Sequence, residues 1–241
     1  MQFTYDAYSN MLSKLHDKGY VFSNYNECRN LNGKIVILRH DIDYSLDKAV
    51  AFAELEAKMN VSSTYFVLLT SEFYNMMAKD NIEKIININR LGHDIGLHFD
   101  ETNYSQNYYN ENGGIKNVIF QEIKWLSEIT GTGINSVSMH RPSKKTLNDN
   151  IDLSPIVNSY GEYFFKGFKY VSDSRRNWRE NIDGIIESGL HEKLHILTHA
   201  FWYNEKEYSL KESITEFINN GNKERHRALE SNITDLHKIL E

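Results

Sequence analysis

Short apolar runs alternate with amphipathic segments along this chain, and the alternation predicts the order of its elements. Apolar and β-branched runs predict buried strands at residues 34–39, 62–69, 94–98, 134–139, 169–172 and 194–198. Apolar residues three and four apart predict helices at residues 5–18, 46–59, 79–91, 115–130 and about 209–240. Residues 103–114 and 143–167 show neither period, so we expect them to be irregular. Strands that alternate with helices indicate parallel βαβ units, and we expect one α/β domain over residues 1–241.

The composition of the chain excludes only a few classes of protein. The chain has 241 residues, of which 40% are apolar, and a net charge of -6. An acidic balance argues against nucleic acid as a partner, and the single Cys28 excludes an intramolecular disulfide. The first residues lack the basic and apolar regions of a signal peptide, and no apolar run approaches the ~20 residues of a transmembrane helix. We therefore expect a cytoplasmic protein without a transmembrane segment.

An acidic pair follows the first predicted strand. Asp41 and Asp43 are two residues apart, so in extended chain their side chains share a face about 7 Å apart along the strand. His40 should point to the opposite face. Two neighbouring carboxylates repel each other unless a cation lies between them or one holds a proton. The pattern therefore predicts a cation site.

The other predicted strands also end in residues of catalytic type. The ends of parallel strands meet at one edge of a sheet, where α/β proteins place their chemistry. An Asp or His at one strand end is ordinarily a cap or a structural side chain, but the repetition at successive ends favours a catalytic site. These residues are His98 and Asp100, then His140 and Arg141, then Asp173, Arg175, Arg176 and Trp178, and finally His199, Trp202 and Tyr203.

Taken in order, these segments resemble the polysaccharide deacetylase family (NodB homology, carbohydrate esterase family 4) over about residues 34–203. The segments are RHDID at 39–43, GHDIGLH at 92–98, HRP at 140–142, DSRRNW at 173–178 and LTH at 197–199. The resemblance implies a distorted (β/α) barrel of about seven parallel strands. It also implies metal-dependent hydrolysis of an N-acetyl group on a sugar.

The second segment departs from the family, which usually has another histidine four residues after the first. Here that position is Thr102. Asp43 and His98 alone leave a catalytic Zn²⁺ site one protein ligand short of the usual three. We predict His140 as the third ligand, with Asp100 as the alternative. The expected metal is Zn²⁺, with Co²⁺, Ni²⁺ or Mn²⁺ as alternatives.

The resemblance and the residue types suggest roles for the remaining groups. Asp41 is the expected general base for the attacking water, which the metal makes more acidic. His199 is the expected acid for the leaving amine, because its ordinary pKa lies near neutrality. Arg141 is expected to pair with Asp41 or Asp173 and orient that carboxylate.

Aromatic and basic residues near the last segments are candidates for substrate contact. Aromatic faces stack on sugar rings, and guanidinium groups bind phosphate; solvent exposure or core packing are the alternatives. For Arg39, which shares the face of the acidic pair and could neutralise it, the alternative is a salt bridge. The candidates are Arg39, Arg175, Trp178, Trp202 and Tyr203. The expected substrate is an N-acetylated sugar, a nucleotide sugar or a lipid-linked precursor used in surface polysaccharide biosynthesis. A hydrolase of another amide or of an O-acetyl ester, or an inactive carbohydrate-binding barrel, remains an alternative.

Overall fold

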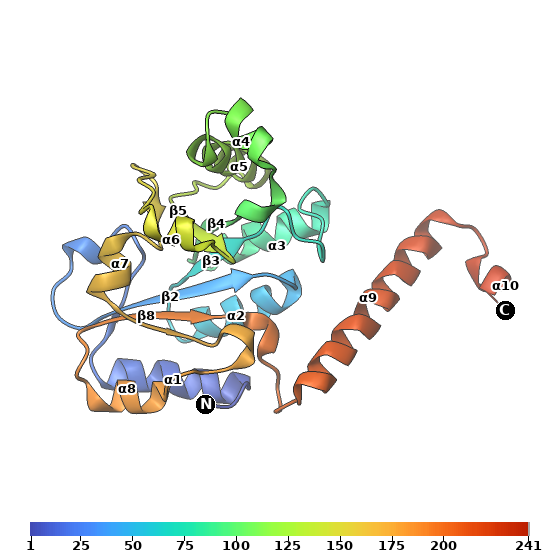
Figure 1. Ribbon diagram of the computed structural model, residues 1–241. Helices are drawn as coiled ribbons and strands as arrows, with labels where there is room; N and C mark the ends of the chain where they lie inside the picture. Colours follow the sequence, from blue (N-terminus) through green and yellow to red (C-terminus); the bar gives the residue numbers. More distant parts are fainter. Residues whose placement is uncertain (241) are drawn as a thin grey trace.

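A curved parallel sheet surrounded by helices forms the body of the molecule, for which the computed structural model describes residues 1–240 (Figure 1). The strands pair in the order β6-β5-β4-β3-β2-β8-β7, and β1 pairs with the start of β2. They are β1 (Val21–Phe22), β2 (Ile35–Ile42), β3 (Thr64–Val67), β4 (Asp94–Asp100), β5 (Ser136–His140), β6 (Val157–Asn158), β7 (Lys169–Ser172) and β8 (Lys193–Thr198). The predicted distorted (β/α) barrel is thereby confirmed.

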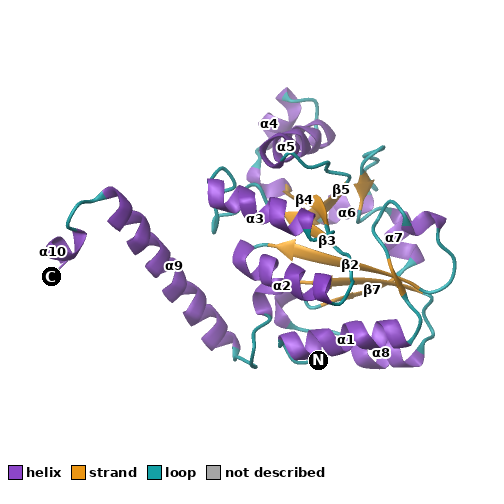
Figure 2. Ribbon diagram, turned by 180° about the vertical axis from the view of Figure 1, so that it is seen from behind, coloured by secondary structure: helices purple, strands orange, loops and turns teal. Residues whose placement is uncertain are grey.

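The helices cover the outside of this sheet, except for the last ones. They are α1 (Tyr5–Asp17), α2 (Leu46–Lys58), α3 (Lys79–Arg90), α4 (Gln106–Glu111), α5 (Ile115–Thr130), α6 (Lys144–Asn148), α7 (Glu162–Gly167), α8 (Ile182–Ser188), α9 (Leu210–Asn232) and α10 (Leu236–Leu240). Figures 1 and 2 show α9 running away from the barrel, with α10 at its far end. None of the helices described within residues 1–240 is long and apolar enough to cross a membrane.

The long predicted elements are confirmed, whereas the two segments predicted to be irregular contain short elements. Helix α4 lies within 103–114, where the Ser105 side chain accepts a hydrogen bond from the backbone N–H of Tyr108. Residues 143–167 contain α6, β6 and α7. Elements of two to six residues are too short to display a hydrophobic period, so local capping decides them instead. The same reason explains why β1 and the seven-residue α8 were not predicted.

Strand β2 is the centre of the fold because it is buried on both faces. Ile35 and Ile37 pack in the same cluster as Phe66, whereas Val36 and Leu38 pack in a second cluster with the outer helices. The alternation continues along the strand. It carries Arg39 and Asp41 to the face of Ile37, the inside of the barrel, and His40 to the face of Leu38. The strand runs to Ile42 rather than ending at residue 39, since it pairs with β8 as far as His40 and with β3 as far as Ile42.

A buried carboxylate fixes the outer face of β2. Glu56, on α2, is fully buried and accepts hydrogen bonds from the hydroxyls of Tyr8 at 2.5 Å, Ser63 at 2.7 Å and Tyr65 at 2.8 Å. Its Oε1 lies 2.9 Å from His40 Nε2. Burial opposes ionisation, but the facing His40 and the hydrogen bonds lower the pKa of Glu56 from 4.5 to about 2. The carboxylate therefore joins α1, α2, β2 and β3.

We expect Glu56→Gln to lower the free energy of unfolding by about 2–4 kcal/mol. The glutamine amide group would place N–H donors against hydroxyls that now donate hydrogen bonds to the carboxylate. Urea denaturation at pH 7 measures this. The folded-state pKa is lowered, so the stabilisation is present above pH 4.5 and is lost as the pH falls toward about 2. Glu54→Gln, at an exposed position on the same helix, is the control and should change stability little. Equal stability of the two variants would contradict this account.

Candidate active site

The acidic pair lies at the inner face of the C-terminal end of β2. Asp41 Oδ2 lies 3.6 Å and Asp43 Oδ1 lies 3.2 Å from the same atom, Nε2 of His98. His40 points the other way and contacts Glu56. Two carboxylates of one strand therefore face one imidazole on β4, as the spacing predicts.

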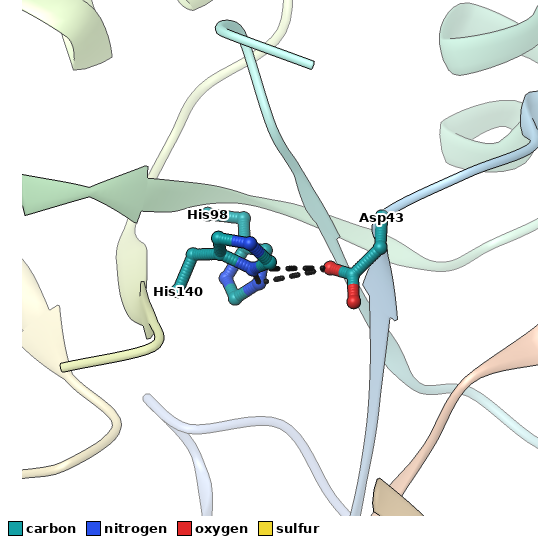
Figure 3. A group of neighbouring side chains, drawn as sticks. All are labelled: Asp43, His98 and His140. Atoms are coloured by element: carbon teal, nitrogen blue, oxygen red, sulfur yellow. Dashed lines mark hydrogen bonds and ion pairs between the residues drawn. The ribbon is translucent and has the colours of Figure 1, made fainter. Parts of the chain in front are cut away.

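Three ligand-type atoms from neighbouring strands form a compact triangle (Figure 3). Asp43 Oδ1 lies 3.2 Å from His98 Nε2 and 3.3 Å from His140 Nδ1, and the two ring nitrogens are 3.0 Å apart. Ligands about 2.0–2.1 Å from a tetrahedral Zn²⁺ ion are about 3.3–3.4 Å apart by geometry. The triangle is therefore close to the size that such an ion requires.

The bonding of these atoms also fits a cation. Asp43 Oδ1 is buried and accepts no hydrogen bond within residues 1–240, which is costly for an ionised oxygen. His98 Nδ1 lies 3.0 Å from Ser138 Oγ, which also accepts a hydrogen bond from Arg39. A proton on Nδ1 would leave the Nε2 lone pair facing the triangle, and such an outer hydrogen bond orients a metal-binding ring. The donor set of one carboxylate and two imidazoles suits a divalent transition metal.

The structure brings His140, rather than Asp100, to Asp43 and His98. Asp100 Oδ1 instead accepts hydrogen bonds from the backbone N–H of Thr102 at 2.9 Å and from its hydroxyl at 2.7 Å. Asp100 thus caps the 3₁₀ turn at Glu101–Asn103. Thr102, at the position of the missing histidine, is exposed in this turn.

Arg39 holds Asp41 in place. Its Nε and one terminal nitrogen donate to the two carboxylate oxygens of Asp41, each at 2.8 Å. Burial would raise the pKa of Asp41, but the guanidinium of Arg39, together with His98 and His199, outweighs burial and lowers the pKa from 3.8 to about 2. Arg39 is itself fully buried, and it forms the salt bridge to the acidic pair that is the alternative to substrate contact. Its role is to orient Asp41.

The structure does not bring Arg141 to either of its expected partners. Within residues 1–240, Asp41 pairs with Arg39 and Asp173 pairs with His199, and neither forms an ion pair with Arg141. Arg141 is exposed and has a φ of 49°, a left-handed backbone conformation directly after His140. Non-glycine residues rarely adopt this conformation. It turns the chain out of the barrel at the end of β5.

His199 and Asp173 form a second buried pair. His199 Nδ1 lies 2.6 Å from Asp173 Oδ1, and the backbone N–H of His199 donates to both oxygens of the same carboxylate. His199 Nε2 lies 3.8 Å from Asp43 Oδ2 and so faces the triangle. Burial would lower the pKa of His199, but the charges of Asp173 and Asp43 raise it from 6.5 to about 9. The ring is thus held as a proton donor beside the triangle.

The fold can be compared with known proteins at this point. No protein-family model matches the sequence, and no curated protein matches it. Solved structures do match its fold. They include proteins of carbohydrate esterase family 4 and a peptidoglycan deacetylase.

Three of these structures show the extent of the likeness. A family 4 pseudoenzyme from Bacillus anthracis is 13% identical over 80% of this chain and 62% of its own, with a TM-score of 0.44. The peptidoglycan deacetylase of Bacillus subtilis is 14% identical over 87% and 98%, with a TM-score of 0.46. A family 4 acetyl xylan esterase from Clostridium thermocellum, in complex with cobalt, is 15% identical over 79% and 85%, with a TM-score of 0.44. The chain thus spans less than two thirds of the length of the pseudoenzyme.

The aromatic residues predicted to contact sugar pack in or against a core cluster. Tyr203 is fully buried and its ring lies 5.4 Å from that of Phe3, while Trp202 is 8% exposed in the same cluster. Trp178 is half-buried against this cluster. The 3₁₀ turn at Ala200–Trp202 directs the chain back onto α2, which places these rings away from solvent. Arg175 is exposed, and no ion pair within residues 1–240 joins it to the triangle.

Other aromatic side chains line a groove of about 910 Å³ between the end of β2 and α9. The Phe201 ring lies 4.6 Å from that of Tyr44 and 5.0 Å from that of Phe217, and Phe73 completes the group. Tyr44 directly follows Asp43, and Phe201 is two residues after His199. Their closeness in sequence to Asp43 and His199 could have identified Tyr44 and Phe201 as neighbours of the site. Phe217 comes from α9, and nothing in the sequence indicates that it joins this group.

Proposed function

We propose that this chain is a metal-dependent hydrolase that removes an N-acetyl group from a sugar or glycan precursor. One observation carries the proposal: Asp43, His98 and His140 form a triangle of metal-ligand size, and both Asp41 and His199 face it. A base and an acid beside a cation are the groups that amide hydrolysis needs. The motif resemblance supports the same reaction.

Asp43, His98 and His140 would hold the metal, and the bound ion would polarise the amide carbonyl and acidify an adjacent water. Asp41 takes the proton of this water as its oxygen attacks the carbonyl carbon. Because its pKa is about 2, Asp41 begins ionised and holds that proton only transiently. Arg39 donates one hydrogen bond to each carboxylate oxygen of Asp41 and so prevents the carboxylate from rotating.

His199 completes the reaction at the other side. When the C–N bond breaks, the nitrogen takes a proton from His199 Nε2, and the products are acetate and a sugar amine. Asp173 accepts from Nδ1 and fixes the ring so that Nε2 faces the substrate. The charge of Asp173 and its hydrogen bond to the ring raise the pKa of His199 and so favour the protonated ring.

The aromatic groove is the proposed place for the sugar. Tyr44 directly follows Asp43 and Phe201 is two residues after His199, and sugar rings can stack on such aromatic faces. We propose an N-acetylated nucleotide sugar or lipid-linked precursor as the substrate class, and surface polysaccharide synthesis as its setting.

Acetate release by the Zn²⁺-loaded protein tests this function. The panel should hold N-acetylated nucleotide sugars, N-acetylated sugar oligomers, O-acetylated sugars and an acetylated peptide amine. We expect acetate and free amine in equal amounts from at least one N-acetylated sugar, and none after chelation of the metal. Acetate from O-acetyl esters alone would replace the proposal with an esterase. Sugar binding without acetate from any substrate would indicate an inactive carbohydrate-binding barrel.

A further inference from the structure

A second cavity, of about 470 Å³, lies on the outer side of the sheet. It is bounded by the chain after β3, by Tyr104 and by α5. Tyr104 stacks on Phe99 with ring centroids 6.0 Å apart, and Phe99 belongs to the outer hydrophobic cluster. His98, the neighbouring residue on β4, faces the inner triangle. The sheet therefore separates this cavity from the candidate active site.

A buried carboxylate with an unused oxygen lines this cavity. Glu122, on α5, is 1% exposed, and its Oε1 accepts a hydrogen bond from the Tyr104 hydroxyl at 2.5 Å. Its Oε2 is buried and has no hydrogen-bond partner within residues 1–240. Burial, and to a smaller extent the charge of Asp100, raise the pKa of Glu122 from 4.5 to about 7. An unsatisfied carboxylate oxygen is costly and calls for a donor.

The rest of the lining favours a positively charged donor with an apolar body. Glu128, six residues further along α5, adds a second carboxylate to the lining, and its Oε1 lies 3.8 Å from Nζ of Lys124 in an exposed pair. Among residues 1–240, none of the side chains that line the cavity is Lys, Arg or His. The walls include Trp125 and Met76, and an aromatic face attracts cations. The volume lies within the usual range of small-molecule sites, roughly 300–1,000 Å³.

We propose that this cavity binds a small organic cation that presents a primary ammonium group on an apolar body. The ammonium group donates to Oε2 of Glu122, which then has a partner for each oxygen. The apolar body packs against Trp125 and Met76. No residue of the Asp43, His98 and His140 triangle takes part, so the inference stands independently of the proposed hydrolysis.

Calorimetric titration of the Zn²⁺-loaded protein with benzylammonium tests the proposal, with benzyl alcohol as a neutral analogue of similar shape. We expect benzylammonium to bind at least ten-fold more tightly than the alcohol. Glu122→Gln should remove this preference while leaving the weak affinity for the alcohol unchanged. The matched control is Glu111→Gln, an exposed glutamate outside the lining, which should behave as wild type.

Trp125→Ala provides a second variant, at a position that is 40% exposed. It should weaken benzylammonium binding at least five-fold, with an unchanged thermal transition. The proposal is overturned if wild-type protein binds neither compound at millimolar concentration, or binds both equally. It is likewise overturned if benzylammonium affinity is unaffected by both Glu122→Gln and Trp125→Ala.

Discussion

Asp41→Asn is expected to lower the turnover of the metal-loaded protein by about 10²–10⁴-fold, the usual contribution of a general base. Asparagine has the shape of aspartate but cannot take a proton from water. Metal content should remain near that of wild type, since Asp41 Oδ2 lies 3.6 Å from His98 Nε2 and outside the triangle. Steady-state acetate release and metal analysis of the same sample measure both quantities.

The substitution also affects Arg39, and a control must separate the two effects. Arg39 is fully buried and would lose its counter-charge, so Asp41→Asn should destabilise the fold as well. Urea denaturation shows whether the variant is folded under assay conditions. Asp17→Asn, at an exposed position on α1, should leave turnover unchanged. If folded, metal-loaded Asp41→Asn kept more than a third of wild-type turnover, another group would have to be the base.

His140→Ala is expected to raise the dissociation constant of Zn²⁺ by at least about 100-fold, because outer-shell changes alone often cost 10–100-fold. Acetate release should fall to background at metal concentrations that saturate the wild type. The reason is the geometry: His140 Nδ1 lies 3.0 Å from His98 Nε2 and 3.3 Å from Asp43 Oδ1. A competition titration with a chromogenic chelator measures the affinity.

Two variants serve as controls for His140→Ala. Asp100→Asn tests the alternative ligand and should keep the metal, because Asp100 caps a turn through Thr102. His226→Ala removes an exposed histidine on α9 and controls for nonspecific metal binding. Loss of metal in Asp100→Asn together with retention in His140→Ala would reverse the assignment.

The sequence predicted the fold well where the hydrophobic pattern extends over several turns or a whole strand. The helix at 5–18 and the strand at 34–39 follow from such patterns, and both exist with slightly different ends. The same alternation predicted that Asp41 and Asp43 share a face. Short elements such as α4 depend on a single cap, which leaves no periodic signal.

The candidate site was predicted in part, for a physical reason. Parallel strands bring their C-terminal ends together, so residues such as His98 and His199 could be placed near one another without knowledge of any side-chain contact. Which arginine pairs with Asp41 depends on the direction of each side chain. Arg39 lies two residues before Asp41 on the same face of β2, whereas Arg141 follows His140 where the backbone turns outward.

The burial of the aromatic residues near His199 could not be predicted, because distance along the chain does not determine burial. Trp202 and Tyr203 closely follow His199, but a single 3₁₀ turn directs both into the core, while Phe201 between them and His199 reaches the groove. Phe217 joins the groove from α9 and depends on tertiary packing. Local pattern cannot reveal such long-range contacts.

An anomalous-difference map of crystals grown with Zn²⁺, recorded on both sides of the zinc absorption edge, tests the central claim most directly. We expect one strong peak inside the barrel, about 2.0–2.2 Å from Asp43 Oδ1, His98 Nε2 and His140 Nδ1. A map without a peak among these atoms, or with a peak bound by Asp100 in place of His140, would contradict the proposed metal centre.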